Sequence, residues 1–289
     1  MKKNIIFVVN PISGDIDKSE LLRTVEEFSA VNNFNLLVYE TVGEKDELAI
    51  QSLYNEFNPS RIVVAGGDGT IKMVAEAMEK HDVVIGILPA GSANGLAVDL
   101  NLPTTLEENL EVAFLHHYIE MDMICINGKK CIHLSDIGIN ADLVKNYEEG
   151  EVRGLWGYAL QAYTTLKDSE EPFLASITAN KQTVEHTARM IVIANSQKYG
   201  TGVTINPNGS MNDGKFELIV LKSLDLVLLG KIIIGNMPID SDDIVIISTE
   251  KAVVKTDRPI NFQIDGEYCG AESELEIHIL HHQMKVAIP

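Results

Sequence analysis

Two rhythms of apolar and polar residues alternate along the first 118 positions of the chain. Short apolar runs have the length and composition of buried parallel strands; they occupy positions 3–9, 34–41, 61–65 and 83–88. Between and after them, apolar side chains recur at helical spacing; these segments are 19–31, 44–57, 71–78 and 106–117. Strands that alternate with helices predict an α/β domain with a parallel sheet and crossover connections.

The periodicity of the apolar residues changes near residue 118. Positions 120–126 alternate with a period of two, and Asn127-Gly128 is typical of a hairpin turn. Further strands are predicted at 131–135, 173–179, 190–195, 216–221, 243–248, 252–256, 260–264 and 275–280, and helices only at 147–166 and 224–234. The fold class is therefore α/β plus all-β: a domain of residues 1–118, then an antiparallel, β-sandwich-like domain of residues 119–289. The tail could return to the first domain.

Three loops of small residues follow predicted parallel strands, at 10–14, 66–70 and 89–95. Because the carboxyl ends of parallel strands share one edge of the sheet, these loops should gather where α/β proteins bind ligands. Glycines permit positive φ and close approach of another molecule, and a helix N-terminus favours phosphate. Asp68 could hold a metal ion or accept a proton. The alternative is an ordinary glycine turn in which Asp68 caps the helix.

Charge and composition argue against some classes of binding partner. The 289 residues carry a formal charge of −19, from 23 basic and 42 acidic side chains, which argues against nucleic-acid binding and against docking on anionic lipid by bulk charge. The apolar run after Lys2-Lys3 is too short for a signal peptide, and 226–234 is too short and interrupted to span a membrane. Three cysteines without metal or redox spacing fit a reducing compartment. We expect a cytoplasmic protein, with peripheral membrane contact left open.

Four motifs together suggest a family. Asn-Pro-Ile-Ser-Gly at 10–14, Gly-Gly-Asp-Gly-Thr at 66–70, Gly-Ser-Ala-Asn-Gly at 91–95 and Asp-Gly-Glu at 265–267 stand in this order. Their order and spacing resemble the diacylglycerol kinase catalytic family, which includes bacterial lipid kinases, sphingosine kinases and ceramide kinases. The resemblance covers nearly the whole chain. It implies that the first domain binds ATP, that the second helps to bind lipid, and that the active site lies between them.

The resemblance also assigns residues to the nucleotide. Asn10, Pro11, Ser13 and Gly14 would contact its phosphates, and Thr41 would lie near it. Gly66, Gly67, Asp68, Gly69 and Thr70 would wrap the phosphates, with Lys72, Ser92 and Asn94 adding contacts. Plainer interpretations stay open: Asn10 and Asn94 as turn formers, Thr41 as an ordinary strand end, and Lys72 as a solvated side chain.

The magnesium position and the second acid come from the resemblance too. Asp213, helped by the backbone carbonyls of Ser210 and Lys215, resembles a structural magnesium site made of oxygen ligands; an Asp-Gly turn is the alternative. Glu267 would accept a proton, or assist, alongside Asp68. Which of the two acids takes the proton of the lipid hydroxyl stays open. Without the other motifs, Asp-Gly-Glu at 265–267 would be interpreted as an exposed turn.

The third loop departs from many diacylglycerol kinases, because Asn94 is followed by Gly95 instead of Asp. This looks more like the sphingosine kinase branch. In this chain, Gly138-Ile-Asn-Ala-Asp142 followed by Arg153-Gly154 resembles the sphingosine kinase segment that holds the lipid head group. Asp142 would then bind a hydroxyl or an amine; the alternative is that Asp142 caps a helix. Residues around Trp156 could touch the membrane interface.

These observations predict an ATP- and magnesium-dependent lipid kinase that phosphorylates a hydroxyl of a diacylglycerol or sphingoid lipid at the membrane surface. Two alternatives remain. One is an NAD-kinase-like enzyme, although the later Asn-Glu and Thr-Gly-Ser-Thr-Ala-Tyr elements of that family are missing. The other is a lipid-binding module without catalysis. The sequence leaves open which lipid is the physiological substrate and whether the protein forms a homodimer.

Overall fold

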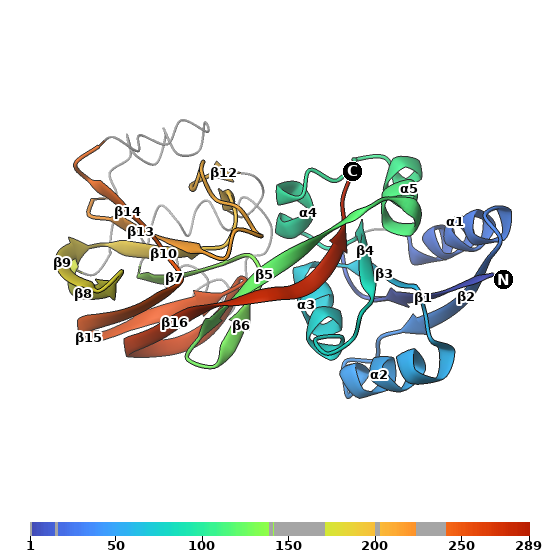
Figure 1. Ribbon diagram of the computed structural model, residues 1–289, viewed down its shortest axis with the longest axis horizontal. Helices are drawn as coiled ribbons and strands as arrows, with labels where there is room; N and C mark the ends of the chain where they lie inside the picture. Colours follow the sequence, from blue (N-terminus) through green and yellow to red (C-terminus); the bar gives the residue numbers. More distant parts are fainter. Residues whose placement is uncertain (1, 15–16, 139–140, 142–170, 200–202, 224–240) are drawn as a thin grey trace. The chain divides into compact units, whose positions relative to one another are not determined.

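The computed structural model describes residues 2–14, 17–138, 141, 171–199, 203–223 and 241–289 (Figure 1). They form two compact units. The first runs to Met121 and includes His282–Pro289, and the second comprises Asp122–Tyr199 and Val203–His281. The predicted helices 147–166 and 224–234, together with Asp142, Arg153 and Trp156, lie outside the described residues.

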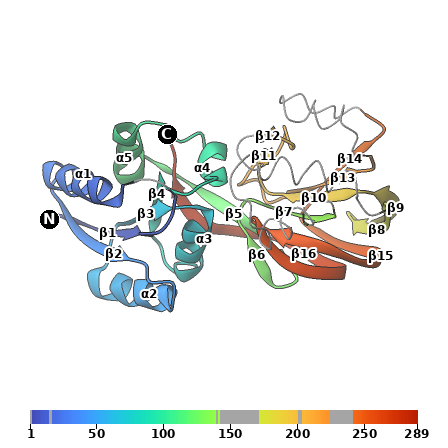
Figure 2. The ribbon, with the colours of Figure 1, turned by 180° about the vertical axis from the view of Figure 1, so that it is seen from behind.

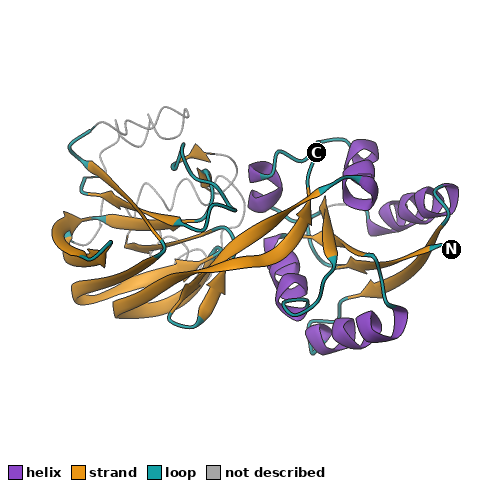
Figure 3. Cartoon of the chain, viewed as in Figure 1, coloured by secondary structure: helices purple, strands orange, loops and turns teal. Residues whose placement is uncertain are grey.

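A parallel sheet forms the centre of the first unit (Figure 3). Its strands are ordered β2 (Phe34–Glu40), β1 (Lys3–Val9), β3 (Arg61–Gly66) and β4 (Val84–Pro89). The end of β16 (Glu267–Ala287) adds a parallel strand, with Lys285 opposite Val84 and Val286 opposite Ile85. The central strands are buried, as expected when helices cover both faces of a parallel sheet.

Helices cover the two faces of this sheet in pairs. On one face lie α1 (Lys18–Val31) and α5 (Leu106–Leu115), whose apolar side chains share a core with the strands. On the other lie α2 (Asp46–Phe57) and α3 (Asp68–Ala77) (Figures 1 and 2). A short helix, α4 (Gly95–Asp99), follows the third loop. The predicted α/β pattern is confirmed: the predicted and observed ends agree within two residues, except that α3 begins at Asp68 and not at residue 71.

The second unit is built almost entirely from antiparallel strands. Its main path is β14 (Ile244–Thr249), β13 (Phe216–Leu221), β10 (Met190–Ala194), β7 (Leu134–Gly138), β15 (Lys251–Ile264) and β16. Side pairs are β8 (Phe173–Ala179) with β15 and β9 (Gln182–Ala188), and β5 (Tyr118–Ile126) with β6 (Lys129–Cys131) and β16. The strands β11 (Lys198–Tyr199) and β12 (Val203–Thr204) form a separate two-stranded sheet. The predicted all-β class is confirmed.

Four predicted strands of the second unit lie in observed strands but differ from them in their bounds. The runs 252–256 and 260–264 belong to one strand, β15, interrupted by a register shift between Lys255 and Ile260. The run 275–280 is the middle of β16, whose first eight residues are all at least partly exposed and so gave no alternating signal. The run 131–135 divides between β6 and β7. Strand β9 was missed because six of its seven residues are at least partly exposed.

Candidate active site

The three glycine loops of the first unit meet at the carboxyl end of the parallel sheet, with main chain against main chain. A Cβ atom built on Gly91 would lie 2.4 Å from the Cα of Gly67. One built on Gly14 would lie 2.6 Å from the carbonyl oxygen of Ala90, and Gly14 also has a φ of +55°. Contacts this short leave no room for a side chain, which explains the glycines at these positions.

The glycines of the second loop are not required by a left-handed backbone, and only Gly66 is required by close packing. None of Gly66, Gly67 and Gly69 has a positive φ, contrary to the expectation from sequence. A Cβ on Gly66 would lie 2.6 Å from the Cβ of Thr70, whereas one on Gly69 would have nothing within 4 Å. Gly69 is exposed in the first turn of α3. The start of this helix is thus open to a ligand.

Asp68 joins the second loop to the third. It is the first residue of α3, whose N-cap is Gly67, so the proposed capping role of Asp68 is wrong for that helix. Its carboxylate instead accepts hydrogen bonds from the backbone N–H groups of Gly95 (2.8 Å) and Leu96 (3.1 Å). These residues begin α4. Asp68 therefore holds the start of α4 beside the start of α3.

Asn10 joins the first loop to the second. Its Nδ2 donates to the hydroxyl of Thr70 at 3.1 Å, and its Oδ1 accepts from the N–H of Ile12 at 3.2 Å. Within the first loop, the hydroxyl of Ser13 donates to the carbonyl of Asn10, and Pro11 is exposed. Asn10 acts as a turn former and as a link between loops.

The remaining predicted nucleotide ligands of the first unit lie on the same edge of the sheet. Asn94 has left-handed backbone and hydrogen bonds to both N–H and C=O of Gly91, at 2.8 Å each, which is a turn-forming role. Ser92 is exposed. Thr41 follows β2, and its N–H donates to the carbonyl of Val9 at 2.9 Å. Lys72 is half-buried on α3.

Two residues that support these loops were missed from sequence. Lys18, the first residue of α1, donates from Nζ to the carbonyl of Ala90 at 3.4 Å, and burial lowers the pKa of its ammonium.

Asp46 is 7% exposed and accepts hydrogen bonds from the hydroxyl of Tyr39 (2.6 Å) and from the N–H groups of Val42 (2.9 Å) and Gly43 (2.8 Å). Asp46 thereby fixes the backbone that follows Thr41. An acid in a first helical turn is too common to single out from sequence.

Burial and hydrogen bonding shift the pKa of Asp46 in opposite directions. Burial by itself would raise the pKa of the carboxyl, but the hydrogen bonds from Tyr39, Val42 and Gly43 outweigh it, so the pKa is lowered. For Tyr39, burial together with the bond to Asp46 raises the pKa to about 12. The pair is therefore an ionised carboxylate and a neutral phenol at neutral pH.

In the second unit, Asp265 and Gly266 form the two-residue turn between β15 and β16, with φ of +51° and +86°. Positive φ at both central positions is the mark of a type I′ hairpin, for which Asp-Gly is favoured. The Asp265 carboxylate accepts from the N–H groups of Ile132 (3.1 Å) and His133 (2.9 Å), which anchors the turn. The next residue, Glu267, is exposed. A rigid turn thus presents its carboxylate to solvent.

The predicted magnesium position is also an anchored turn. Oδ1 of Asp213 accepts from the N–H of Lys215 at 3.0 Å, and the hydroxyl of Ser210 donates to Oδ1 of Asn212 at 2.9 Å. Gly214 has a φ of +77°, so the Asp-Gly turn interpretation describes the backbone. Among the described residues, no group of three or more His, Cys, Asp or Glu could hold a metal ion. Any cation here would rest on Asp213 and on carbonyl oxygens.

Comparison with known proteins agrees with both units. Residues 4–126 match the family model of the diacylglycerol kinase catalytic domain, and residues 136–287 match that of the YegS C-terminal NAD kinase beta sandwich-like domain. Probable lipid kinases YegS of Escherichia coli O1:K1 and Shigella boydii serotype 18 are each 26% identical over 236 residues, which is 79% of this chain and 78% of theirs.

A solved structure has the same fold. The crystal structure of a diacylglycerol kinase from Bacillus anthracis superimposes with a TM-score of 0.79 at 22% identity, over 99% of this chain and 97% of that one. Two family models that together span almost the whole chain, in the predicted order, decide the family. The chain belongs to the lipid kinase family that joins a diacylglycerol kinase catalytic domain to a YegS C-terminal β-sandwich-like domain.

Proposed function

We propose that this protein transfers the terminal phosphate of ATP to a hydroxyl of a diacylglycerol or sphingoid lipid, with magnesium, at a membrane surface. The convergence of three glycine loops, locked by the hydrogen bonds from Gly95 and Leu96 to Asp68, carries the proposal. Phosphoryl transfer depends on positioning and on stabilising charge, and a fixed set of backbone N–H groups provides both. No described helix is long and apolar enough to cross a membrane.

The site fits a nucleoside triphosphate. The open space over Gly69 lies at the N-terminus of a helix of ten residues, where unpaired N–H groups and the helix dipole favour phosphate. Asn10, Ser13 and Ser92 offer polar groups on the neighbouring loops, and Lys72 a positive charge. In this assignment Thr41 contributes next to the nucleotide, from the loop that Asp46 fixes.

Magnesium would neutralise charge on the phosphates when bound. For a structural cation in the second unit, Asp213 and the carbonyls of Ser210 and Lys215 form the candidate set. All are hard oxygen donors, which suits magnesium. The anchored backbone between Ser210 and Lys215 would keep these oxygens in place without a large rearrangement.

The hydrogen bonds suggest different roles for the two acids. Both oxygens of Asp68 already accept backbone N–H groups, so Asp68 has a positioning role in the loops. Glu267 is exposed and follows a turn that Asp265 holds. We therefore assign to Glu267 the proton of the attacking lipid hydroxyl, which a carboxylate can accept as the oxygen–phosphorus bond forms.

Transfer of radiolabel tests the proposal. Purified protein is incubated with γ-labelled ATP and vesicles that carry diacylglycerol, monoacylglycerol, sphingosine or ceramide, each with magnesium and with a chelator. We expect label on at least one lipid, only when magnesium is present. Label on NAD but on no lipid would replace the proposal with a nucleotide kinase. Lipid binding without transfer would indicate a module that has lost catalysis.

A further inference from the structure

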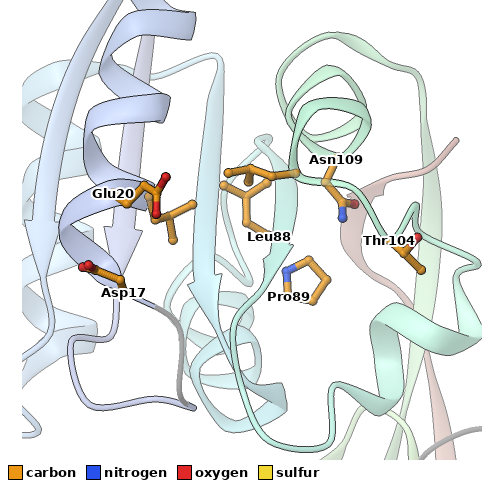
Figure 4. A pocket seen from close by; sticks show the side chains of 8 residues that line it. Asp17, Glu20, Leu88, Pro89, Thr104 and Asn109 are labelled. Atoms are coloured by element: carbon orange, nitrogen blue, oxygen red, sulfur yellow. The ribbon is translucent and has the colours of Figure 1, made fainter.

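A pocket of about 230 Å³ opens in the first unit beside the starts of α1 and α5 (Figure 4). Asp17 is the N-cap of α1, and Glu20 lies in the first turn of that helix, where an acid is favourable. The side chain of Asn109 donates to the backbone of the loop before α5. The polar groups of this pocket thus stabilise the helices that carry them.

A buried pair of polar side chains lies in the sheet of the second unit. Asp136 on β7 is 0% exposed, Gln263 on β15 is 1% exposed, and the two residues face each other in the antiparallel ladder. Nε2 of Gln263 donates to Oδ2 of Asp136. On its other side, Asp136 stands opposite Val192 of β10. The carboxylate therefore has a strand on each side.

The other end of the Gln263 amide holds the turn that precedes Glu267. Its Oε1 accepts from the N–H of Gly266 at 2.7 Å. Because a backbone N–H can only donate, the amide oxygen must face Gly266 and the amide NH₂ must face Asp136. A hydrogen bond to a charged acceptor is roughly twice as strong as one between neutral groups. Asp136 therefore fixes the orientation of the amide that the turn requires.

Stability alone does not account for this pair. Burying a carboxylate and an amide costs free energy, and apolar side chains of similar volume often give equal or higher stability. The turn is also anchored already, through the hydrogen bonds of the Asp265 carboxylate to the backbone. The bond from Gly266 to Gln263 adds a second anchor, one residue closer to Glu267.

We propose that Asp136 and Gln263 are positioning residues for the carboxylate of Glu267. Asp136 orients the amide of Gln263, which holds the N–H of Gly266. The backbone at Glu267 then continues from a fixed turn. The inference rests on the proposed role of Glu267 as the acceptor of the proton of the lipid hydroxyl. Misplacement by about 1 Å can lower a rate about a hundredfold, so loss of the anchor should lower turnover.

Gln263→Met replaces the amide with an apolar side chain of similar shape and tests the proposal in the full-length protein. We expect the amide hydrogen of Gly266 to exchange at least about tenfold faster, as measured by NMR, because it has lost its acceptor. Turnover of the lipid should fall at least about tenfold. The affinity for ATP, measured by calorimetry, should stay at the wild-type value, since Gln263 belongs to the second unit. Exchange or turnover at the wild-type rate would overturn the proposal.

Ser135→Ala is the matched control, because the buried hydroxyl of Ser135 donates to the backbone carbonyl of Gln263 and not to its side chain. It should lower the melting temperature without changing turnover or the exchange of Gly266. Equal loss of turnover in Gln263→Met and Ser135→Ala would refute the positioning role.

A second variant keeps the test available if Gln263→Met does not fold. The neutral side chain of Asp136→Asn should hold the Gln263 amide less firmly. The amide hydrogen of Gly266 should then exchange roughly threefold faster and turnover should fall roughly threefold. Wild-type values of both would refute the proposal.

Failure of the kinase proposal gives a different result. If the wild type phosphorylates no lipid, the proposed function fails, and the exchange of Gly266 in Gln263→Met still decides whether the pair holds the turn. If the wild type is active and Glu267→Gln is equally active, Glu267 does not take the proton and the positioning role fails with it.

Discussion

The carboxylate of Asp68 holds the backbone of Gly95, whose N–H donates to it at 2.8 Å across 27 positions of sequence. The neighbouring N–H of Leu96 donates to the other oxygen at 3.1 Å. An acid that looks catalytic from its motif is thus the link that keeps two of the glycine loops together. Loss of its charge should affect both the stability and the activity of the protein.

Asp68→Asn should lower the melting temperature and reduce lipid phosphorylation at least about a hundredfold. The amide keeps one acceptor, but its NH₂ group faces a backbone donor, and a donor left unpaired costs about 1–3 kcal/mol. Circular dichroism gives the first effect and the radiolabel assay the second. Wild-type values for both would contradict the role of Asp68 in holding the loops. An unchanged melting temperature with lost turnover would shift its role to the chemistry.

Two glycine substitutions separate packing from ligand binding. Gly91→Ala places a Cβ 2.4 Å from the Cα of Gly67, so the backbone must move, and we expect a loss of about 1–3 kcal/mol of stability. Gly69→Ala meets nothing within 4 Å and lies in a helix, so it should keep or raise the stability.

The two variants should nevertheless share one defect. The methyl group of Gly69→Ala enters the open space where a phosphate would approach, so its affinity for ATP should fall, as measured by calorimetry. Gly91→Ala should lose affinity through its displaced loop. If Gly69→Ala binds ATP as the wild type does, the phosphates do not approach the start of α3.

The parallel sheet explains why part of this site could be predicted and part could not. Loops that follow parallel strands must share an edge, so the gathering of residues 10–14, 66–70 and 91–95 followed from the strand pattern alone. The contacts of Gly67 with Gly91 and of Asp68 with Gly95 depend on tertiary packing, which leaves no periodic trace in sequence.

The sequence of the second unit contains a hairpin signal that the strand pattern obscured. Asp265-Gly266 is a strong short hairpin signal, yet the start of β16 lacks alternating buried residues, which concealed the second strand. Recognising the hairpin would have joined 260–264 to its partner strand. It would also have identified Asp265 as the anchoring acid and Glu267 as the exposed one.

Asp46 should make the stability of the protein depend on pH. Because its pKa is lower in the folded protein than in the unfolded chain, its contribution is complete above the unfolded value of about 3.9 and is lost as the pH falls through the folded value. Asp46→Asn should therefore be less stable than the wild type at pH 7, with a difference that narrows below about pH 4. Urea denaturation from pH 7 to pH 3 measures it.

The exposed Glu47, on the same helix, is the matched control for this effect. Glu47→Gln should follow the wild-type pH profile, because an exposed carboxylate gains little from its surroundings. A constant difference between Asp46→Asn and the wild type at every pH would show that shape, not charge, makes Asp46 important.

Glu267→Gln should abolish phosphorylation of the lipid while ATP still binds. The nearly isosteric change keeps the type I′ turn, which Asp265 and Gly266 form without the side chain of Glu267. The glutamine amide cannot accept the proton of the attacking hydroxyl, so the turnover number should fall by at least about a hundredfold, within the range for general base catalysis. Glu272→Gln, an exposed change on the same strand, should leave turnover unchanged. Steady-state kinetics with varied ATP, and calorimetric titration with ATP, distinguish the outcomes. If ATP affinity falls while turnover at saturation survives, Glu267 binds the nucleotide instead of taking the proton.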